Sequence, residues 1–225
     1  MGRVGLLSGR GVLVTGSGGP VAESVVDQLL GSGARVAVTD ALAQAPNPTP
    51  ALGSRRLVLP CGPDNPAEQS AVVETLLERF GRLDHLVNLV PTSPEAGSLM
   101  ECDPSALRDI VQRHLATPLA WIQRGYWRWM AAHGGSVVNV VTGVVGNGMQ
   151  DAALAGLIQL TEWLAAELAP DVDLYMVVPG TMLDSAAYQG GVAQALSDLL
   201  ADRGRLGPGP VFVLTDASIR PVNVA

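Results

Sequence analysis

The apolar positions of the chain form two kinds of segment that alternate along its length. Short, valine-rich apolar runs bounded by glycine or polar residues are typical of parallel strands covered on both faces. They occupy residues 11–15, 35–39, 57–59, 85–90, 137–141, 174–178 and 211–214. Segments with apolar residues three or four apart predict helices at 20–30, 67–80, 104–132, 150–169 and 192–202. This alternation predicts a Rossmann-type, doubly wound parallel sheet of about seven strands in three α/β/α layers.

Length and composition limit the functions open to the chain. Its 225 residues predict a single domain spanning 1–225, and 48% apolar with 16% charged residues suits a buried parallel sheet. A net charge of −7 without a basic run argues against nucleic acid or an anionic membrane surface as partner. No apolar run reaches the ~18 residues of a membrane span, and the N-terminus lacks a signal-peptide pattern. Cys61 and Cys102 have no metal or redox spacing, so we expect a reduced, cytoplasmic protein.

The basic residues are of one kind only. All 14 are arginine, and the chain contains no lysine. A base-composition bias of the genome would explain this count. Whatever its origin, the chain has no lysine to form a Schiff base or to lower the pKa of a neighbouring phenol.

The segment from Ser136 to Leu168 holds the place where chemistry is expected. Its strand leads through a Thr/Gly/Asn-rich loop into an apolar helix. In an open α/β sheet, ligands bind just beyond the carboxyl ends of such strands. Thr142 supplies a hydroxyl there, but the start of the helix is mostly chemically inert.

Several motifs resemble the short-chain dehydrogenase/reductase family in order and in near-family spacing. They are TGSGGPVAE from Thr15, VTD from Val38, ERFGRLDHLVNLVP from Glu78, GGSVVNVVTG from Gly134 and VVPGT from Val177. The resemblance covers essentially the whole chain. It implies a seven-stranded Rossmann-type sheet that binds a nicotinamide dinucleotide, with catalysis by Asn, Ser and a Tyr-x-x-x-Lys pair.

The phosphate loop departs from the family pattern TGxxxGxG. Pro20 and Ala22 stand where the second and third glycines belong, and Pro20 has no N–H to offer. Gly16, Ser17 and Gly18 are the candidate cofactor-binding residues of this turn, as part of a small anion nest. The alternative is a tight strand–helix turn with nothing bound.

Other positions where the family would hold its cofactor also depart from the family pattern. Asp40, at a strand end, is a candidate ligand for ribose hydroxyls and would favour NAD over NADP; the alternative is a solvated acid. Asn88 is a further candidate, or it simply ties strands together. Gly62 replaces the family's acid near adenine, and Val90 and Pro91 are expected to narrow the groove. The cofactor is therefore either none or NAD.

The catalytic pair is missing. Counting back from Glu167–Pro170 places Gln150 at the family's Tyr position and Leu154 at its Lys position. Gln150 is a poor proton donor and Leu154 carries no charge. Thr142 falls at the Ser position and His114 near the Asn position; the alternatives are a loop hydroxyl that caps backbone and a helix-surface or interface histidine. We therefore expect no catalytic residue among these four degenerate positions.

Two helices are candidates for a partner surface, because relatives commonly assemble through the corresponding helices. The segment 103–132 carries Trp121, Trp127 and Trp129, and the segment 150–169 is dense in small residues. Aromatic anchors facing small residues suit a helix–helix interface. Trp121 and Trp129 share a helical face, whereas Trp127 points elsewhere, so we expect an oligomer; the alternative is packing within one subunit.

Three hypotheses of function follow. The first is a catalytically degenerate family member, a pseudoenzyme that acts as a structural or regulatory subunit of a heteromeric oxidoreductase with an intact relative. The second is an enzyme with a remodelled site: an atypical NAD(P)-dependent reductase, or a non-redox cyclase, dehydratase or isomerase that uses Thr142, His114 and Asp151. The third is a sensor module that binds NAD without chemistry.

Overall fold

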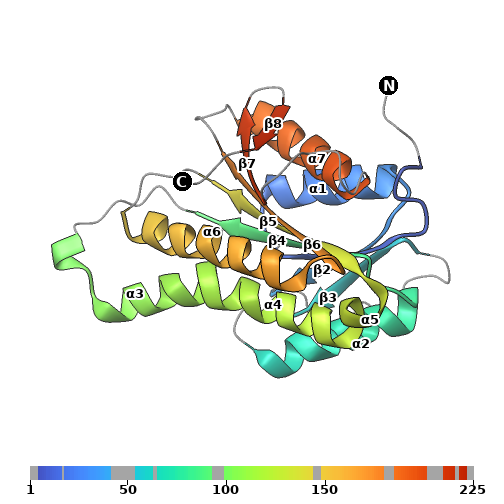
Figure 1. The fold of residues 1–225 in the computed structure, drawn as a ribbon, viewed down its shortest axis with the longest axis horizontal. Coiled ribbons are helices and arrows are strands. Elements are labelled where there is room, and N and C mark those ends of the chain that lie inside the picture. Colours follow the sequence, from blue (N-terminus) through green and yellow to red (C-terminus); the bar gives the residue numbers. More distant parts are fainter. Residues whose placement is uncertain are drawn as a thin grey trace.

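A computed structural model describes residues 5–16, 18–41, 54–62, 65–92, 99–143, 148–179, 185–201, 210–215 and 218–221. These residues form an eight-stranded sheet in the order β3-β2-β1-β4-β5-β6-β7-β8 (Figure 1). The first seven strands pair in parallel, as the strand–helix alternation predicts. The strands are β1 Gly11–Thr15, β2 Arg35–Asp40, β3 Arg56–Pro60, β4 His85–Pro91, β5 Gly135–Thr142, β6 Val172–Pro179, β7 Val211–Thr215 and β8 Ser218–Pro221.

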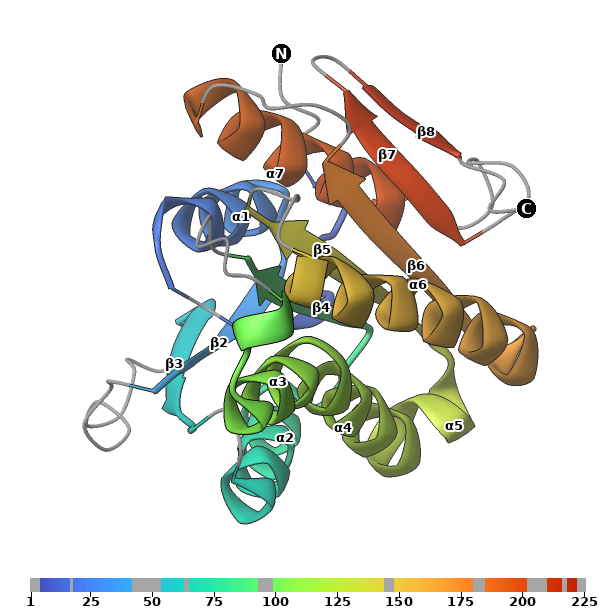
Figure 2. The same cartoon turned by 90° about the vertical axis from the view of Figure 1, so that its left-hand side faces the viewer.

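Helices cover both faces of the sheet, so the α/β/α layering is confirmed (Figures 1 and 2). Alternate residues of β1 face the two helical layers. Val12 and Val14 pack on one face of the sheet, and Leu13 packs on the opposite face. The first layer contains α1 Pro20–Gly31 and α7 Ser185–Ala201. The second contains α2 Pro66–Phe80, α3 Pro104–Val111, α4 Thr117–Gly125, α5 Ala131–His133 and α6 Gly148–Leu168.

The structure differs from the expected elements in three places. An eighth strand, β8, pairs antiparallel with β7 at one edge of the sheet and raises the expected count of about seven. The last helix begins at Ser185 rather than near residue 192. The expected helix 104–132 is a series of α-helical segments separated by the π-helical segments Gln112–Ala116 (η2) and Tyr126–Met130 (η3). A short 3-10 turn, Leu99–Glu101 (η1), precedes it.

A proline accounts for the first irregularity. Pro118 lies at the start of α4 and has no N–H to donate to a carbonyl one turn earlier. A local change to π-helical bonding accommodates this missing bond, and such segments are frequent at functional sites. The π-helical segment η2 contains His114, one of the candidate site residues. Within the ranges that the structure describes, no helix combines the length and apolar character needed to cross a membrane.

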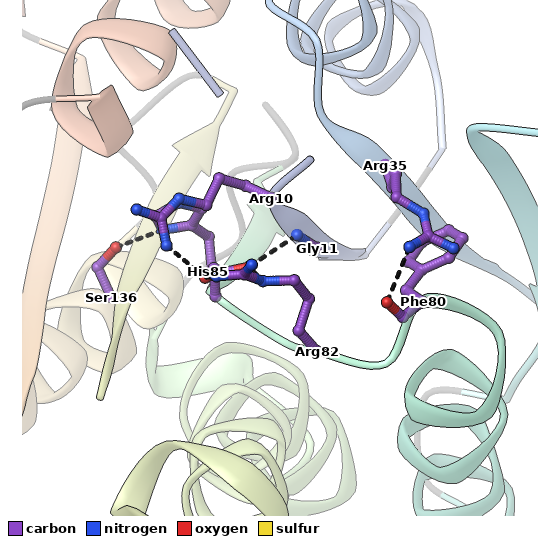
Figure 3. Close-up of polar contacts among 8 residues, drawn as sticks. Arg10, Gly11, Arg35, Phe80, Arg82, His85 and Ser136 are labelled. Carbon is purple, nitrogen blue, oxygen red and sulfur yellow. Dashed lines mark hydrogen bonds and ion pairs between the residues drawn. The ribbon is translucent and has the colours of Figure 1, made fainter. Parts of the chain in front are cut away.

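A charged cluster fixes the amino end of the central strands (Figure 3). The Asp84 carboxylate accepts hydrogen bonds from Arg10 at 2.8 Å, from Arg82 at 2.6 Å and from the Gly11 N–H at 2.8 Å. Burial alone would raise the pKa of Asp84, but these hydrogen bonds and the nearby guanidinium charges lower it to about 2. The buried carboxylate is thus ionised and ties the start of β1 to the start of β4.

Two further sets of polar contacts join neighbouring elements of the fold. His85 Nδ1 lies 2.7 Å from Ser136 Oγ, which links β4 to β5. Arg35 donates to the carbonyl oxygens of Phe80 at 2.8 Å and Arg79 at 2.6 Å, so it caps the end of α2 while lying over the Phe80 ring. Arginine suits this position because its guanidinium can donate to two carbonyls and contact an aromatic face together.

Candidate functional site

A cavity of about 170 Å³ lies at the carboxyl ends of β1, β2, β3 and β4, beside the start of α4. This is the end of the sheet at which open α/β folds bind ligands, and the crevice falls where the strand order reverses between β1 and β4. Apolar groups from Leu89, Pro118 and Trp121 form much of its wall, and Arg113 is its one lining cation among the described residues. The sequence pattern predicts the place of this cavity.

The turn after β1 forms one side of the cavity. Gly16 has a φ of +71°, and a Cβ there would overlap the carbonyl oxygen of Leu89 on β4. Only glycine therefore allows β1 to approach β4 this closely. Pro20 occupies the first turn of α1, as predicted, with Gly19 as an N-cap that makes no side-chain capping bond. Ser17, a candidate cofactor ligand, lies outside the described residues, and Gly18 has open space around it.

A chain of buried hydrogen bonds runs from the cavity wall into the second helical layer. Thr15 Oγ1 donates to Asn88 Oδ1 at 2.7 Å, and Asn88 Nδ2 donates to Asn139 Oδ1 at 2.9 Å. Asn139 Nδ2 donates to Thr161 Oγ1 at 3.2 Å, and that hydroxyl donates to the Leu157 carbonyl at 2.7 Å. Asn88 therefore ties β1, β4 and β5 together, the structural alternative raised from the sequence. Its cofactor-binding role stays a prediction.

The β3 side of the cavity is closed by its own contacts. The Gly62 N–H donates to Glu68 Oε2 at 2.7 Å, and the Cys61 thiol donates to the Gly62 carbonyl at 3.3 Å. Burial, and then the charge of Glu68, raise the pKa of Cys61 to about 11 despite the opposing charge of Arg124. This thiol is therefore protonated at neutral pH and is a poor nucleophile.

Asp40, the candidate ligand for ribose hydroxyls, lies beside the cavity. It ends β2, and its carbonyl accepts from the Cys61 N–H at 3.2 Å. Its neighbours Thr39 and Ala41 line the cavity, whereas Asp40 is not among the described lining residues. Its role in ribose recognition stays a prediction.

Helix α6 holds Gln150 and Leu154, the residues that the resemblance assigns to the catalytic pair, in packed surroundings. Leu154 is 4% exposed and belongs to an apolar cluster with Val90, Val141, Leu157 and Met176. Gln150, one turn earlier, is also buried. The expectation that Val90 narrows the groove is wrong, because its side chain turns into this cluster. Pro91 does line the cavity.

His114 is neither a surface nor an interface residue, so that alternative is wrong. It is 3% exposed, with Nδ1 lying 2.9 Å from the Ile110 carbonyl oxygen and Nε2 lying 2.8 Å from that of Pro91. The π-helical turn η2 aims the ring at the end of β4. Both ring nitrogens thus lie within hydrogen-bond distance of backbone carbonyls, of which a neutral ring can donate to one, and the Nε2 contact joins η2 to β4. Pro91 also pairs with Thr142 across β4 and β5, so the structure brings His114 and Thr142 to either side of one residue.

The ends of β4 and β5 stay in close contact beyond this pair. A Cβ built on Gly143 would overlap the hydroxyl and carbonyl oxygens of Thr92. The Thr92 hydroxyl is buried and makes no hydrogen bond within the described part of the chain. Glycine at 143 is therefore required by this close approach of the two strand ends.

A nicotinamide dinucleotide, the group that the family resemblance implies, fits the described residues only in part. The cavity at β1–β4 measures about 170 Å³, whereas pockets that enclose drug-sized ligands measure about 300–1,000 Å³. The adjacent region, where β4 and β5 end, is taken up by the cluster around Leu154 and by the Thr92–Gly143 contact. The described residues also include no group of three or more His, Cys, Asp or Glu side chains placed to hold a metal ion.

Sequence reasoning missed the cavity wall that the segment 103–132 provides. Four lining residues come from this segment, which the sequence assigned to a partner surface: Arg113, Thr117, Pro118 and Trp121. The proline within an otherwise helical pattern was the available signal, because a helix-disrupting residue kept mid-helix often marks a site.

Known proteins share this sequence pattern and fold. The model of the short chain dehydrogenase family matches residues 10–192. The 3-oxoacyl-(acyl-carrier-protein) reductase FabG of Salmonella typhimurium is 28% identical over 213 residues, covering 88% of this chain and 84% of the reductase. Tropinone reductase-like 3 of Erythroxylum coca is 23% identical over 133 residues, or 58% of this chain and 52% of that protein.

Solved structures agree on the fold. A short-chain dehydrogenase/reductase from Burkholderia xenovorans superposes with a TM-score of 0.78 at 23% identity, covering 95% of this chain and 97% of its own. Another from Serratia marcescens gives 0.76 at 20% identity, with 92% and 95% covered. The family match spans most of the chain, and so the protein belongs to the short-chain dehydrogenase family.

Proposed function

We propose that this chain is a non-catalytic member of its family, which serves as a structural or regulatory subunit beside an intact relative in an oxidoreductase. The observation that carries the proposal is Leu154. The resemblance assigns it to the family's lysine position, and its side chain is buried among apolar side chains. A cation there would need solvent or a partner charge, and the cluster offers neither.

The chemistry of the remaining groups supports the same proposal. Hydride transfer to a carbonyl requires a proton donor whose pKa is matched to neutral pH. Gln150 cannot fill this role, and no lysine exists in the chain to tune a phenol. His114, a titratable side chain near the end of β4, has both ring nitrogens within hydrogen-bond distance of backbone carbonyls. This engagement also weighs against the remodelled-enzyme hypothesis.

The outer surface of α3 and α6 supports the subunit role. Trp163 on α6 is 72% exposed, and Leu107 and Val111 on α3 are 45% and 39% exposed. Small exposed residues lie along the same helix, namely Ala152, Ala155 and Ala166. Trp121 and Trp129 pack inward, so they are not the anchors of such a surface. An exposed apolar face of this kind suits a helix–helix interface.

A binding module without chemistry is the second candidate. The observation that favours it is the cavity at the ends of β1–β4, which persists although the catalytic positions are filled. The two roles are compatible, because a ligand held there would stabilise a subunit by mass action.

Activity of the isolated chain tests the first proposal. We expect no oxidation of NADH or NADPH above buffer with a panel of carbonyl substrates, followed by nicotinamide absorbance. Turnover that is lost in Thr142→Ala or His114→Ala would overturn the proposal.

Co-expression tests the subunit role. An intact family member encoded nearby is expected to co-purify with this chain and to need it for full activity. Trp163→Asp should abolish co-purification. Leu6→Asp changes a side chain that is 40% exposed outside these helices and serves as the matched control. Equal co-purification of both variants would contradict an interface on α6.

A further inference from the structure

A second hollow shares none of its described lining residues with the cavity at the ends of β1–β4. It is a groove of about 420 Å³ between α2 and the α4–η3 segment, which pack beside each other (Figure 2). We name it the α2–η3 groove. Its volume falls within the range of about 300–1,000 Å³ that is typical of small-molecule sites. Its described lining residues are Ser70, Glu74, Gln123, Arg124, Trp127 and Arg128.

Hydrogen-bond donors dominate the α2–η3 groove. Arg124 donates one N–H to the Ala120 carbonyl at 2.9 Å, and its buried Nε makes no hydrogen bond to any residue that the structure describes. An arginine carries five N–H donors, so most donors of Arg124 have no acceptor in the protein. The exposed side chains of Gln123 and Trp127 add an amide NH₂ and an indole N–H. A ligand of this groove must therefore supply acceptors.

The charge of the groove favours an anion with a single charge. Arg128 forms an ion pair with Glu74 across the groove, so these two charges cancel. Arg124 is half-buried, and it forms no ion pair with a carboxylate in the described part of the chain. One positive charge thus remains uncompensated. A carboxylate matches it in charge and in its planar, bidentate geometry.

Trp127 gives the groove a flat apolar surface. Its side chain is 75% exposed, and its ring meets the Tyr126 ring edge-to-face with the centroids 4.9 Å apart, which favours one orientation of the indole. Both residues lie in η3, a π-helical segment that contains no proline to explain it. Such segments are frequent at functional sites. A flat ring stacked on this indole would bring its own substituent towards the neighbouring arginines.

Trp163 offers a comparison within the same chain. It is 72% exposed on α6, nearly as much as Trp127. Its helix contains no basic residue, and Glu162 precedes it in the sequence. An aromatic ligand without charge has no reason to prefer one of these two indoles, whereas an aromatic anion should select Trp127.

From these observations we propose that the α2–η3 groove binds a small aromatic carboxylate, whose carboxylate group pairs with Arg124 and whose ring stacks on Trp127. The inference goes beyond the proposed function. It concerns neither Trp163 nor the cavity at β1–β4, so it is tested independently of the subunit role and of hydride transfer.

Titration of the full ¹⁵N-labelled chain with 2-naphthoate, followed by the indole N–H signals, tests the inference. Single Trp→Phe variants assign these signals. We expect 2-naphthoate to shift the Trp127 signal with a dissociation constant of roughly 1 mM, as the binding energy per atom of a ligand of this size implies. The Trp163 signal should stay in place. 2-Naphthamide, which has the same ring without the charge, should bind about tenfold more weakly.

Two pairs of variants locate the carboxylate. Arg124→Gln should weaken 2-naphthoate binding about tenfold and leave 2-naphthamide binding unchanged, whereas Arg108→Gln, at an exposed position of α3, should change neither. Gln123→Glu leaves the half-buried Arg124 intact and adds a negative charge to the groove, which should also weaken 2-naphthoate about tenfold. Gln159→Glu, at an exposed position of α6, is its control. Melting curves verify that each variant is folded.

Several results would overturn the inference. One is an unshifted Trp127 signal at about ten times the expected dissociation constant. Others are equal shifts of Trp127 and Trp163, or unchanged affinity of Arg124→Gln for 2-naphthoate. A shift confined to Trp121, which lines the cavity at β1–β4, would place the ligand there instead. Binding of 2-naphthyl phosphate more than tenfold tighter than 2-naphthoate would contradict a site for a single negative charge.

Discussion

The two ends of the parallel sheet are built from different polar chemistry. At the amino end, the Asp84 carboxylate is ionised and held by two arginines and a backbone N–H. At the carboxyl end, neutral side chains from Thr15 to Thr161 pass hydrogen bonds to one another, and Leu154 sits in an apolar cluster. Charge thus stabilises one end, whereas packing and neutral hydrogen bonds stabilise the end where ligands bind. The difference implies that acid weakens the amino end through protonation of Asp84.

Leu154→Lys is expected to have the largest effect. It would bury an ammonium with no partner among apolar side chains, which costs about 3–5 kcal/mol. We expect the melting temperature to fall by roughly 10 °C or more. Leu154→Met, which keeps the volume, should cost less than about 1.5 kcal/mol. A stable Leu154→Lys variant would mean that this end is an open catalytic pocket after all.

Asp84→Asn is expected to have the next largest effect. It removes the charge that pairs with Arg10 and Arg82, and denaturant unfolding should show a loss of about 2–3 kcal/mol. Asp109→Asn, an exposed position on α3, should change stability by less than about 0.5 kcal/mol. Equal effects would show that the amino-end cluster is only a surface ion pair.

The same aspartate predicts a pH dependence with a definite sign. The pKa of Asp84 is about 2 in the folded chain, below the ~3.9 of an unfolded aspartate. Its contribution is therefore complete above about pH 4 and is lost as the pH falls towards 2. Unfolding free energies measured between pH 6 and pH 2.5 should fall less steeply for Asp84→Asn than for the unmodified chain. Parallel curves would exclude Asp84 as a source of acid sensitivity.

A smaller effect is expected from Asn139→Leu in the neutral chain of hydrogen bonds. Asn88 and Thr161 each keep a second carbonyl acceptor, so the loss should be about 1–2 kcal/mol and independent of pH from 5 to 8. Combined with Asn88→Ala, it should show a coupling of about 1 kcal/mol, whereas Ser32→Ala, in the other helical layer, should be additive. Additivity in both pairs would contradict a connected chain.

The smallest effect concerns thiol reactivity. Burial and the charge of Glu68 raise the pKa of Cys61 to about 11, so iodoacetamide at pH 7.5 should leave it unmodified in the folded chain. Cys102 is more exposed and should react. Peptide mass analysis before and after unfolding measures both sites. Rapid labelling of Cys61 in the folded chain would indicate that the cavity wall opens.

Sequence patterns alone predicted most of the sheet. The parallel strands followed from short apolar runs, because a strand buried on both faces must be apolar throughout. The eighth strand was missed, since Ser218–Pro221 is short, ends in proline and pairs only at an edge. The break at Gln112–Ala116 was missed because π-helical bonding leaves no periodicity of its own.

The sequence by itself determined that the chain has no lysine to lower the pKa of a phenol. It also predicts Gln150 and Leu154 at the family's paired positions, and this assignment stays a prediction. Only the tertiary structure decided how the remaining groups are used. It turned Val90 away from the groove, buried His114 between two carbonyls and brought Arg113 to the cavity. The physical reason is that side-chain direction depends on strand pairing and helix register, which are set by contacts between residues far apart in the chain.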